Sequence, residues 1–155
     1  MVENEKKRRF RVDWLIYILA AAGLVGLLIW STRGELSRNP SREATADLGP
    51  NGFVTIRFST SPYPPLPTGT VNLSFMPMDS RGRTVAIDSL TYEYGPAGSD
   101  QPVGSGIAKP MADNSGMLMA GARFPSVGDW WLRARVTLGG AQGDVRFTFY
   151  VEPAQ

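Results

Sequence analysis

The chain has 155 residues, 16 basic and 14 acidic side chains and a net charge of +2, and it contains neither cysteine nor histidine. Without cysteine it has no disulfide framework and no thiol chemistry, and without histidine it lacks the commonest general base and the usual catalytic triad. The excess of positive charge comes from the first 30 residues, so it does not predict a nucleic-acid partner for the rest of the chain.

An uncharged stretch runs from Trp14 to Trp30. As a helix it would span about 25 Å, close to the ~30 Å of a hydrocarbon core, with a tryptophan at each membrane interface. Five basic residues before the stretch against three after it favour a cytoplasmic N-terminus. The alternative is a cleavable signal peptide, but the Ala-x-Ala at 44–46 lies too far downstream. We expect a cytoplasmic stub over 1–13 and a transmembrane helix over 14–32.

Small residues recur at helical spacing within this expected anchor. Such residues allow two membrane helices to approach closely, although small residues are also frequent in helices that serve only as lipid anchors. The sequence therefore predicts a packing surface for a second helix at Ala20, Ala22, Gly23 and Gly26.

Residues 33–52 are rich in Gly, Pro and scattered charges, which predicts a flexible linker. From Phe53 onward the hydrophobic period is two, the pattern of half-buried strands. Seven short strands separated by turn signals predict an all-β, immunoglobulin-like antiparallel β-sandwich over 53–152, without the cysteine pair of antibody domains. The expected strands lie within 53–59, 70–75, 84–94, 103–111, 116–124, 132–138 and 145–151, the last two joined in a hairpin at Gly139 and Gly140 or by a loop reaching Gly143.

Methionine is the residue type here with the most suggestive chemistry. At positions i and i+2 two side chains project from the same face of a strand, and thioether sulfur suits Cu(I). If Phe75 and Leu118 point inward, the neighbouring methionines point outward. The candidate ligands are Met76, Met78, Met111, Met117 and Met119. The competing interpretation is an apolar interface built from the same residues, Met117 and Met119 above all, because copper sites in such domains commonly include histidine.

Two consecutive tryptophans occur near the end of the domain. Consecutive residues on a strand face opposite sides, so Trp130 accompanies Leu132 into the core and Trp131 lies outside beside Arg133 and Arg135. An exposed tryptophan flanked by arginine is typical of a binding hot spot. The alternative is that arginine stems stack on the ring.

The segment Ser61–Pro67 is a second candidate for contact with a partner. Its prolines enforce an extended chain with few donors, which either shields a sheet edge or offers Tyr63 and Leu66 to a partner.

Several of these features together resemble the YtkA-like and FixH-like proteins. The resemblance rests on the proline-rich segment through Gly69, an Asp79-x-x-Gly82 turn, methionines in the middle strands, Phe124-Pro-x-x-Gly128-Asp-Trp130-x-Leu132 and the final hairpin. It implies an N-terminal membrane anchor, an exported domain, and association with the assembly or copper supply of respiratory oxidases.

We therefore expect a non-enzymatic, single-pass accessory or assembly subunit of a larger membrane complex in respiratory or photosynthetic electron transport. It would lie in the inner (plasma) membrane with its C-terminal domain periplasmic or extracellular, bind other subunits, and hold no cofactor. The alternative is a copper-handling protein that delivers Cu(I) to an oxidase through its methionines.

Overall fold

The computed structural model describes residues 17, 20–26, 40–112 and 114–154, and the chain divides into two units, Met1–Arg38 and Asn39–Gln155. In the first unit residues 20–26 are helical, and they include all four residues of the expected helix-packing surface. No helix among the described residues is long and apolar enough to cross a membrane. The stub over 1–13 and most of the expected transmembrane helix over 14–32 lie outside the described residues, and helix packing stays a prediction.

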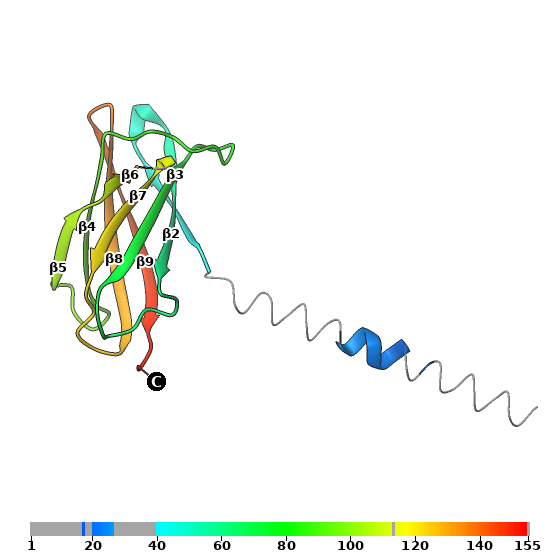
Figure 1. Cartoon of the computed structure of the whole chain (residues 1–155). Helices are drawn as coiled ribbons and strands as arrows, with labels where there is room; N and C mark the ends of the chain where they lie inside the picture. The colour runs from blue at the N-terminus through cyan, green and yellow to red at the C-terminus, as the bar shows by residue number, and fades with distance from the viewer. Residues whose placement is uncertain (1–16, 18–19, 27–39, 113, 155) are drawn as a thin grey trace, which may run out of the picture. The chain divides into compact units, whose positions relative to one another are not determined.

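The second unit is an antiparallel β-sandwich (Figure 1). One sheet has five strands in the order β1-β2-β3-β7-β6, and the other has four in the order β5-β4-β8-β9. In chain order the elements are β1 (Arg42–Asp47), η1 (Gly49–Asn51), β2 (Phe53–Ser61), β3 (Val71–Met78), β4 (Ser89–Pro96), β5 (Gly104–Ile107), β6 (Lys109–Met111), β7 (Asn114–Ala122), β8 (Gly128–Leu138) and β9 (Ala141–Val151).

Alternation of apolar and polar residues builds the core between the two sheets. Phe58 on β2 and Phe75 on β3 are fully buried, and their ring centroids lie 5.4 Å apart. Phe147 and Phe149 on β9 meet Phe58 from the opposite sheet, with centroids at 5.0 and 5.8 Å. The predicted two-sheet architecture is therefore confirmed, with nine strands in the described part of the chain in place of seven.

The predicted C-terminal hairpin is confirmed in register. β8 and β9 pair along their whole length, from Gly128 opposite Val151 to Leu138 opposite Ala141. Only two residues remain for the turn, Gly139 and Gly140, and both have positive φ, 57° and 81°. That backbone is the one a two-residue turn between right-twisted strands needs, and glycine adopts it without steric cost.

The expected linker over 33–52 is wrong for the residues that the structure describes. Residues 42–47 form β1, which pairs with β2 in register from Arg42 opposite Phe58 to Asp47 opposite Phe53. Ala46 and Leu48 are buried in the core. Because the inward residues of β1 are alanines, the strand carries too little hydrophobic signal to be distinguished from a polar linker.

Two expected strands also differ from the structure. Of the strand expected over 84–94, only residues from Ser89 onward belong to β4. The strand expected over 103–111 is two strands in different sheets, β5 and β6, separated by the buried Ala108. The single residue Ala108 carries the chain from one sheet to the other. The alternation of apolar and polar residues does not by itself reveal such a change of sheet.

Candidate functional site

The outer face of the five-stranded sheet brings together methionines from two neighbouring strands. β3 and β7 pair with Ser74 opposite Met119 and Phe75 opposite Leu118. Continuing this register by one residue sets Met76 opposite Met117, and directly opposite side chains have Cβ atoms about 4.5–5.5 Å apart. Phe75 and Leu118 face the core, so the predicted outward orientation of the methionines is confirmed.

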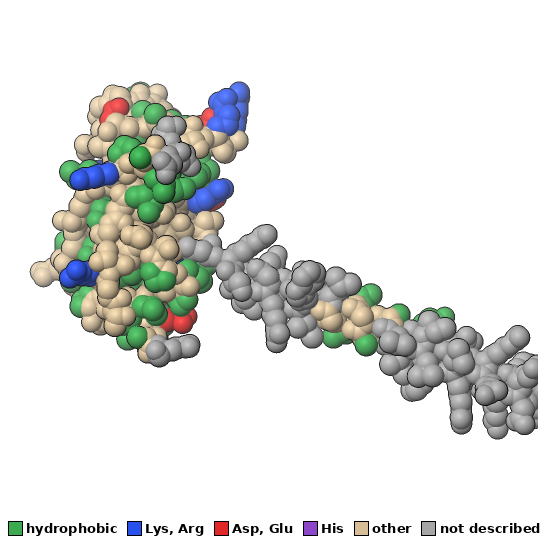
Figure 2. Space-filling view, in the orientation of Figure 1, with side chains coloured by type: hydrophobic (Ala, Val, Ile, Leu, Met, Phe, Trp, Pro, Cys, Tyr) green, Lys and Arg blue, Asp and Glu red, His purple; other side chains and the backbone are tan. Residues whose placement is uncertain are grey.

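We call Met76, Met117 and Met119 the methionine face. All three residues are half-buried, so part of each side chain is exposed on the outer face of the sheet. Figure 2 shows hydrophobic side chains gathered on this side of the sandwich with basic groups around them. The arrangement offers three thioether donors from two adjacent strands, which is the kind of donor set that selects a soft cation.

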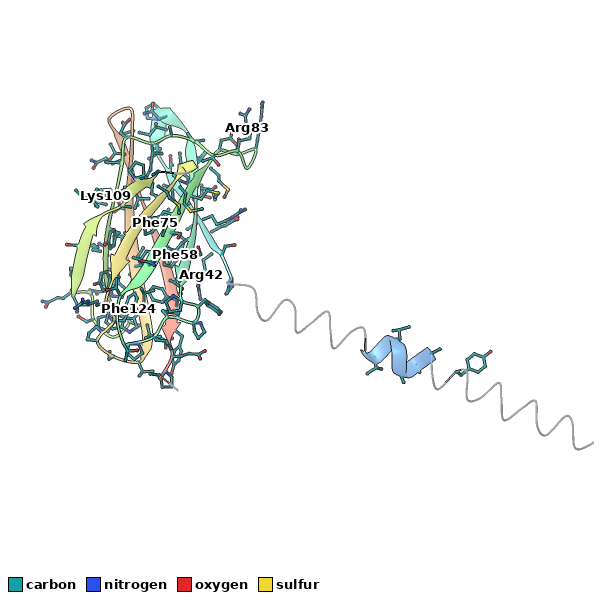
Figure 3. The ribbon with its side chains drawn as sticks, viewed as in Figure 1. Arg42, Phe58, Phe75, Arg83, Lys109 and Phe124 are labelled. Atoms are coloured by element: carbon teal, nitrogen blue, oxygen red, sulfur yellow. The ribbon has the colours of Figure 1, made fainter. Side chains whose placement is uncertain are left out.

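Polar neighbours border the methionine face on both sides. The Ser74 hydroxyl donates a hydrogen bond to Sδ of Met119, with Oγ and Sδ 3.0 Å apart. Lys109, at the β6 edge of the sheet in Figure 3, lies opposite Met119. Arg57 lies opposite Met76, and its Nε is 2.8 Å from Oε1 of Glu43.

The two other candidate methionines do not join this cluster: Met78 lies on the same side of β3 as Met76 but is covered, and Met111 lies apart. Met78 is 4% exposed, because the chain after β3 folds back over it: Met78 forms an isolated bridge with Thr84, and the Val85 N–H donates to the Pro77 carbonyl. Met111 is 39% exposed but follows a register shift in β6 and pairs with Asn114. That is three residues, about 10 Å of strand, from Met117.

No other donor set in the described residues competes with the thioethers. Three or more His, Cys, Asp or Glu side chains do not come together there as a possible metal site. Sulfur is a soft ligand, whereas Cu(II), Ca²⁺ and Mg²⁺ favour nitrogen or oxygen. The nearby ammonium of Lys109 further disfavours a doubly charged ion, whereas the charge of Arg57 is offset by its ion pair with Glu43, so a singly charged soft ion fits this face best.

Sequence reasoning found the methionines but not their polar neighbours. Ser74 is two residues before Met76, so strand alternation alone could have placed both on one face. Lys109 could not have been found in this way, because its position opposite Met119 depends on the pairing of β6 with β7. That pairing follows from the unpredicted change of sheet at Ala108.

On the other sheet the prediction that Trp131 is exposed is wrong. Its side chain points away from the core, yet the residue is only 1% exposed. The loop after β4 covers it, with the indole N–H donating to the Ser99 carbonyl at 2.7 Å. Gly95 makes this approach possible, since a Cβ there would lie 2.8 Å from both the Trp131 ring and the Gln101 carbonyl oxygen.

Two guanidinium groups complete the cover over the Trp131 ring. The Cζ atoms of Arg133 and Arg146 lie 5.6 and 5.3 Å from the ring centroid, within range of a cation–π interaction. The alternative interpretation, in which arginine side chains stack on the Trp131 ring, is therefore the one that the structure supports. The two stacked arginines are Arg133 and Arg146, and Arg135 is not one of them. Trp130 lies in the core as predicted, and its indole N–H donates to the Ser126 carbonyl at 3.1 Å.

Two ion pairs involve Arg133 and Arg135 on the outer face of the four-stranded sheet. Arg133 lies 3.0 Å from Glu93. Arg135 donates two hydrogen bonds to Asp144, at 2.7 and 2.9 Å, and they hold the pKa of that carboxyl below its usual value. A shallow depression of about 360 Å³ lies beside these pairs, lined by Thr91, Ser105, Ile107 and others. With both arginines already paired and exposed to solvent, this face offers a weaker case for a ligand than the methionines do.

The proline-rich segment contributes to the end of the sandwich. The Glu152 N–H, just beyond β9, donates to the Pro65 carbonyl at 3.0 Å, and Pro65 is buried. This contact fits the edge-shielding interpretation. Tyr63 is exposed and Leu66 half-buried, so their role in partner contact stays a prediction.

Comparisons with known proteins agree with the fold. No protein-family model matches the chain, and no curated protein matches it. A copper-bound variant of FetP from uropathogenic Escherichia coli is 12% identical over 74% of this chain and 97% of its own, with a TM-score of 0.50. FetP as isolated (13% identity, 74% and 96% coverage, TM-score 0.49) and CopC from Methylosinus trichosporium OB3b (19% identity, 75% and 97% coverage, TM-score 0.43) are also similar.

At these identities the likeness to FetP shows a shared fold and nothing finer. The fold and the methionine face together define the protein as an antiparallel two-sheet β-sandwich with a thioether cluster on the outside of one sheet. The resemblance to YtkA-like and FixH-like proteins stays a prediction, as do the membrane anchor and the partner complex.

Proposed function

We propose that this chain is a copper-handling protein that holds Cu(I) on the methionine face. The observation that carries the proposal is the pairing of β3 with β7, in which Ser74 lies opposite Met119 and the register, continued by one residue past Phe75 and Leu118, sets Met76 opposite Met117. Thioethers coordinate Cu(I) in preference to harder ions. A fold shared with a protein whose structure contains copper supports the same proposal.

The neighbouring charges fit an exchange site. Lys109 adds repulsion that weakens binding of any cation, whereas the charge of Arg57 is offset by Glu43, and the half-buried side chains of the methionine face are partly accessible to a second protein. A site of this kind accepts and releases its ion without burying it. We therefore propose transfer to another copper protein on the exported side of a membrane, in accordance with the basic N-terminal stub and the apolar stretch that follows it.

Competition for Cu(I) tests this proposal directly. Residues 39–155 contain the whole core and both sheets, so this fragment should fold alone. Titrated with Cu(I) against a chromophoric chelator under reducing, anaerobic conditions, it should bind one equivalent. Met76→Leu and Met117→Leu should each weaken binding about tenfold or more, since each removes a ligand and nearly conserves volume.

Met111→Leu is the matched control, because it removes the same sulfur from a position outside the methionine face. It should leave the affinity within about twofold of the parent fragment. Absence of binding at micromolar Cu(I), or equal losses in all three variants, would refute a site on this face.

A second candidate is the accessory subunit of a membrane complex. The half-exposed apolar side chains of the methionine face favour it, because methionine is an adaptable contact residue at protein interfaces. Extraction of native membranes in mild detergent distinguishes the two functions. A large complex that survives without copper and is disrupted by Met117→Asp would favour the accessory role.

A further inference from the structure

The methionine face also has the properties of an oxidation site. In a chain without cysteine, thioethers are the softest nucleophiles available to an oxidant. The five methionines of the sandwich differ in protection: Met111 is exposed, Met76 and Met117 are half-buried, Met119 receives a hydrogen bond on sulfur, and Met78 is covered. Their susceptibility to oxidation should differ accordingly.

We propose that peroxide oxidises this face in a set order, with Met76 and Met117 modified early, Met119 delayed by Ser74, and Met78 spared. In each reaction a sulfur lone pair attacks one peroxide oxygen and the O–O bond breaks. The hydroxyl transferred to sulfur loses its proton to leave a sulfoxide, and the other oxygen, which leaves as hydroxide, takes up that proton to form water. One thioether and one hydrogen peroxide thus give one sulfoxide and one water.

Ser74 distinguishes Met119 from Met117, which lies two residues away on the same strand face. The Ser74 hydroxyl points its proton at the Met119 sulfur and engages one of its lone pairs. The nucleophilicity of that sulfur falls, while Met117 has no such donor among the contacts described. Met78 is protected by a different cause, the fold-back of the chain at Thr84.

Oxidation would change what the face can bind, a consequence that rests on the proposed copper function. A sulfoxide is polar and presents oxygen in place of a free thioether lone pair, so it is a poor ligand for Cu(I). Loss of Met76 and Met117 as donors would release the ion. The face would then be a copper site that peroxide turns off.

Peptide mass spectrometry of the full-length chain in detergent tests the order. After timed exposure to hydrogen peroxide, fragment ions assign the sulfoxide at each methionine. Met117 should oxidise about threefold faster than Met119, and Met78 about tenfold slower than Met117. In Ser74→Ala the oxidation rate of Met119 should rise to that of Met117, whereas Ser74→Thr, which keeps the hydroxyl, should retain the delay.

The outcomes separate this inference from the copper proposal. Equal rates at Met78 and Met117, or no change at Met119 in Ser74→Ala, would overturn the order whether or not the protein binds copper. If untreated protein binds Cu(I) and oxidised protein binds it equally well, the switch is refuted and the copper function stands. Failure of untreated protein to bind Cu(I) refutes the proposed function and the switch, while the mass spectra alone decide the order.

Discussion

The outer faces of the two sheets use the same strand alternation with opposite results. On β7, Met117 and Met119 point away from the core and stay half-exposed. On β8, Trp131 also points away from the core, yet the loop after β4 and two guanidinium groups cover it. Strand alternation determines the side of the sheet on which a residue lies. Whether that residue is available to a ligand depends on segments that arrive from elsewhere in the chain.

The largest effect should follow removal of the covered ring. Trp131→Ala deletes a buried side chain and its hydrogen bond to Ser99, and should lower the free energy of unfolding by about 3–5 kcal/mol. Urea denaturation of the 39–155 fragment measures this. A loss below about 1 kcal/mol would mean that the loop holds its position without the ring and that the two faces are not so different.

The matching change on the other face should cost little stability. Met117→Leu nearly conserves volume at a half-exposed position, so the free energy of unfolding should fall by less than about 1.5 kcal/mol. Cu(I) affinity in the same variant should fall about tenfold, because the substitution removes one of the thioether ligands. A large loss of stability without a loss of copper binding would assign Met117 to packing and remove the contrast with Trp131.

Removal of one guanidinium group tests how much the cation–π contacts over Trp131 contribute to stability. Arg146→Ala deletes a cation–π contact at 5.3 Å and should cost about 0.5–1 kcal/mol. Arg123→Ala, which removes an arginine remote from this ring, is the control. An equal cost in both variants would show that the stacked geometry adds nothing specific.

Charge near the copper site should have a smaller effect with the opposite sign. Lys109→Gln removes a cation that lies opposite Met119 and should tighten Cu(I) binding about twofold at low salt. Raising the salt concentration should shrink the difference between the two proteins, because screening already weakens the repulsion in the parent. Weaker binding by Lys109→Gln would mean that this lysine helps to form the site.

The smallest expected effect is a pH dependence of the folding stability that comes from the Arg135–Asp144 ion pair. Hydrogen bonds from Arg135 hold the pKa of Asp144 below its usual value, so the unfolded chain takes up this proton at a higher pH than the folded chain does. The contribution to stability is full above the ordinary carboxyl pKa of about 4 and is lost as pH falls through the lower folded value. Asp144→Asn should therefore show a slightly flatter fall in urea midpoint below pH 4. If the urea midpoint of Asp144→Asn depended on pH in the same way as that of the parent, the Arg135–Asp144 pair would not contribute to acid sensitivity.

Much of the sandwich could be predicted from sequence because its longest strands alternate clearly. The β8–β9 hairpin follows from eleven-residue strands with inward Val, Phe and Leu around Gly139 and Gly140. β1 could not be predicted, since alanine at 44 and 46 gives almost no periodic signal. The site was predicted in part: strand parity put Met76, Met117 and Met119 outside, but burial of Met78 depends on a fold-back that no local pattern encodes.

The passage of the chain through Ala108 has a consequence for self-association. Ala108 joins the edge strands β5 and β6 directly, and on the opposite side β1 approaches β9, where a Cβ on Gly143 would lie 2.6 Å from the Asp47 carbonyl oxygen. Open strand edges are templates for stacking between molecules. β5 and β6 are only four and three residues long, and β1 lies beside part of the eleven-residue edge strand β9. While the chain folds, misassembly into strand-paired aggregates is therefore most probable before β1 and β6 have docked.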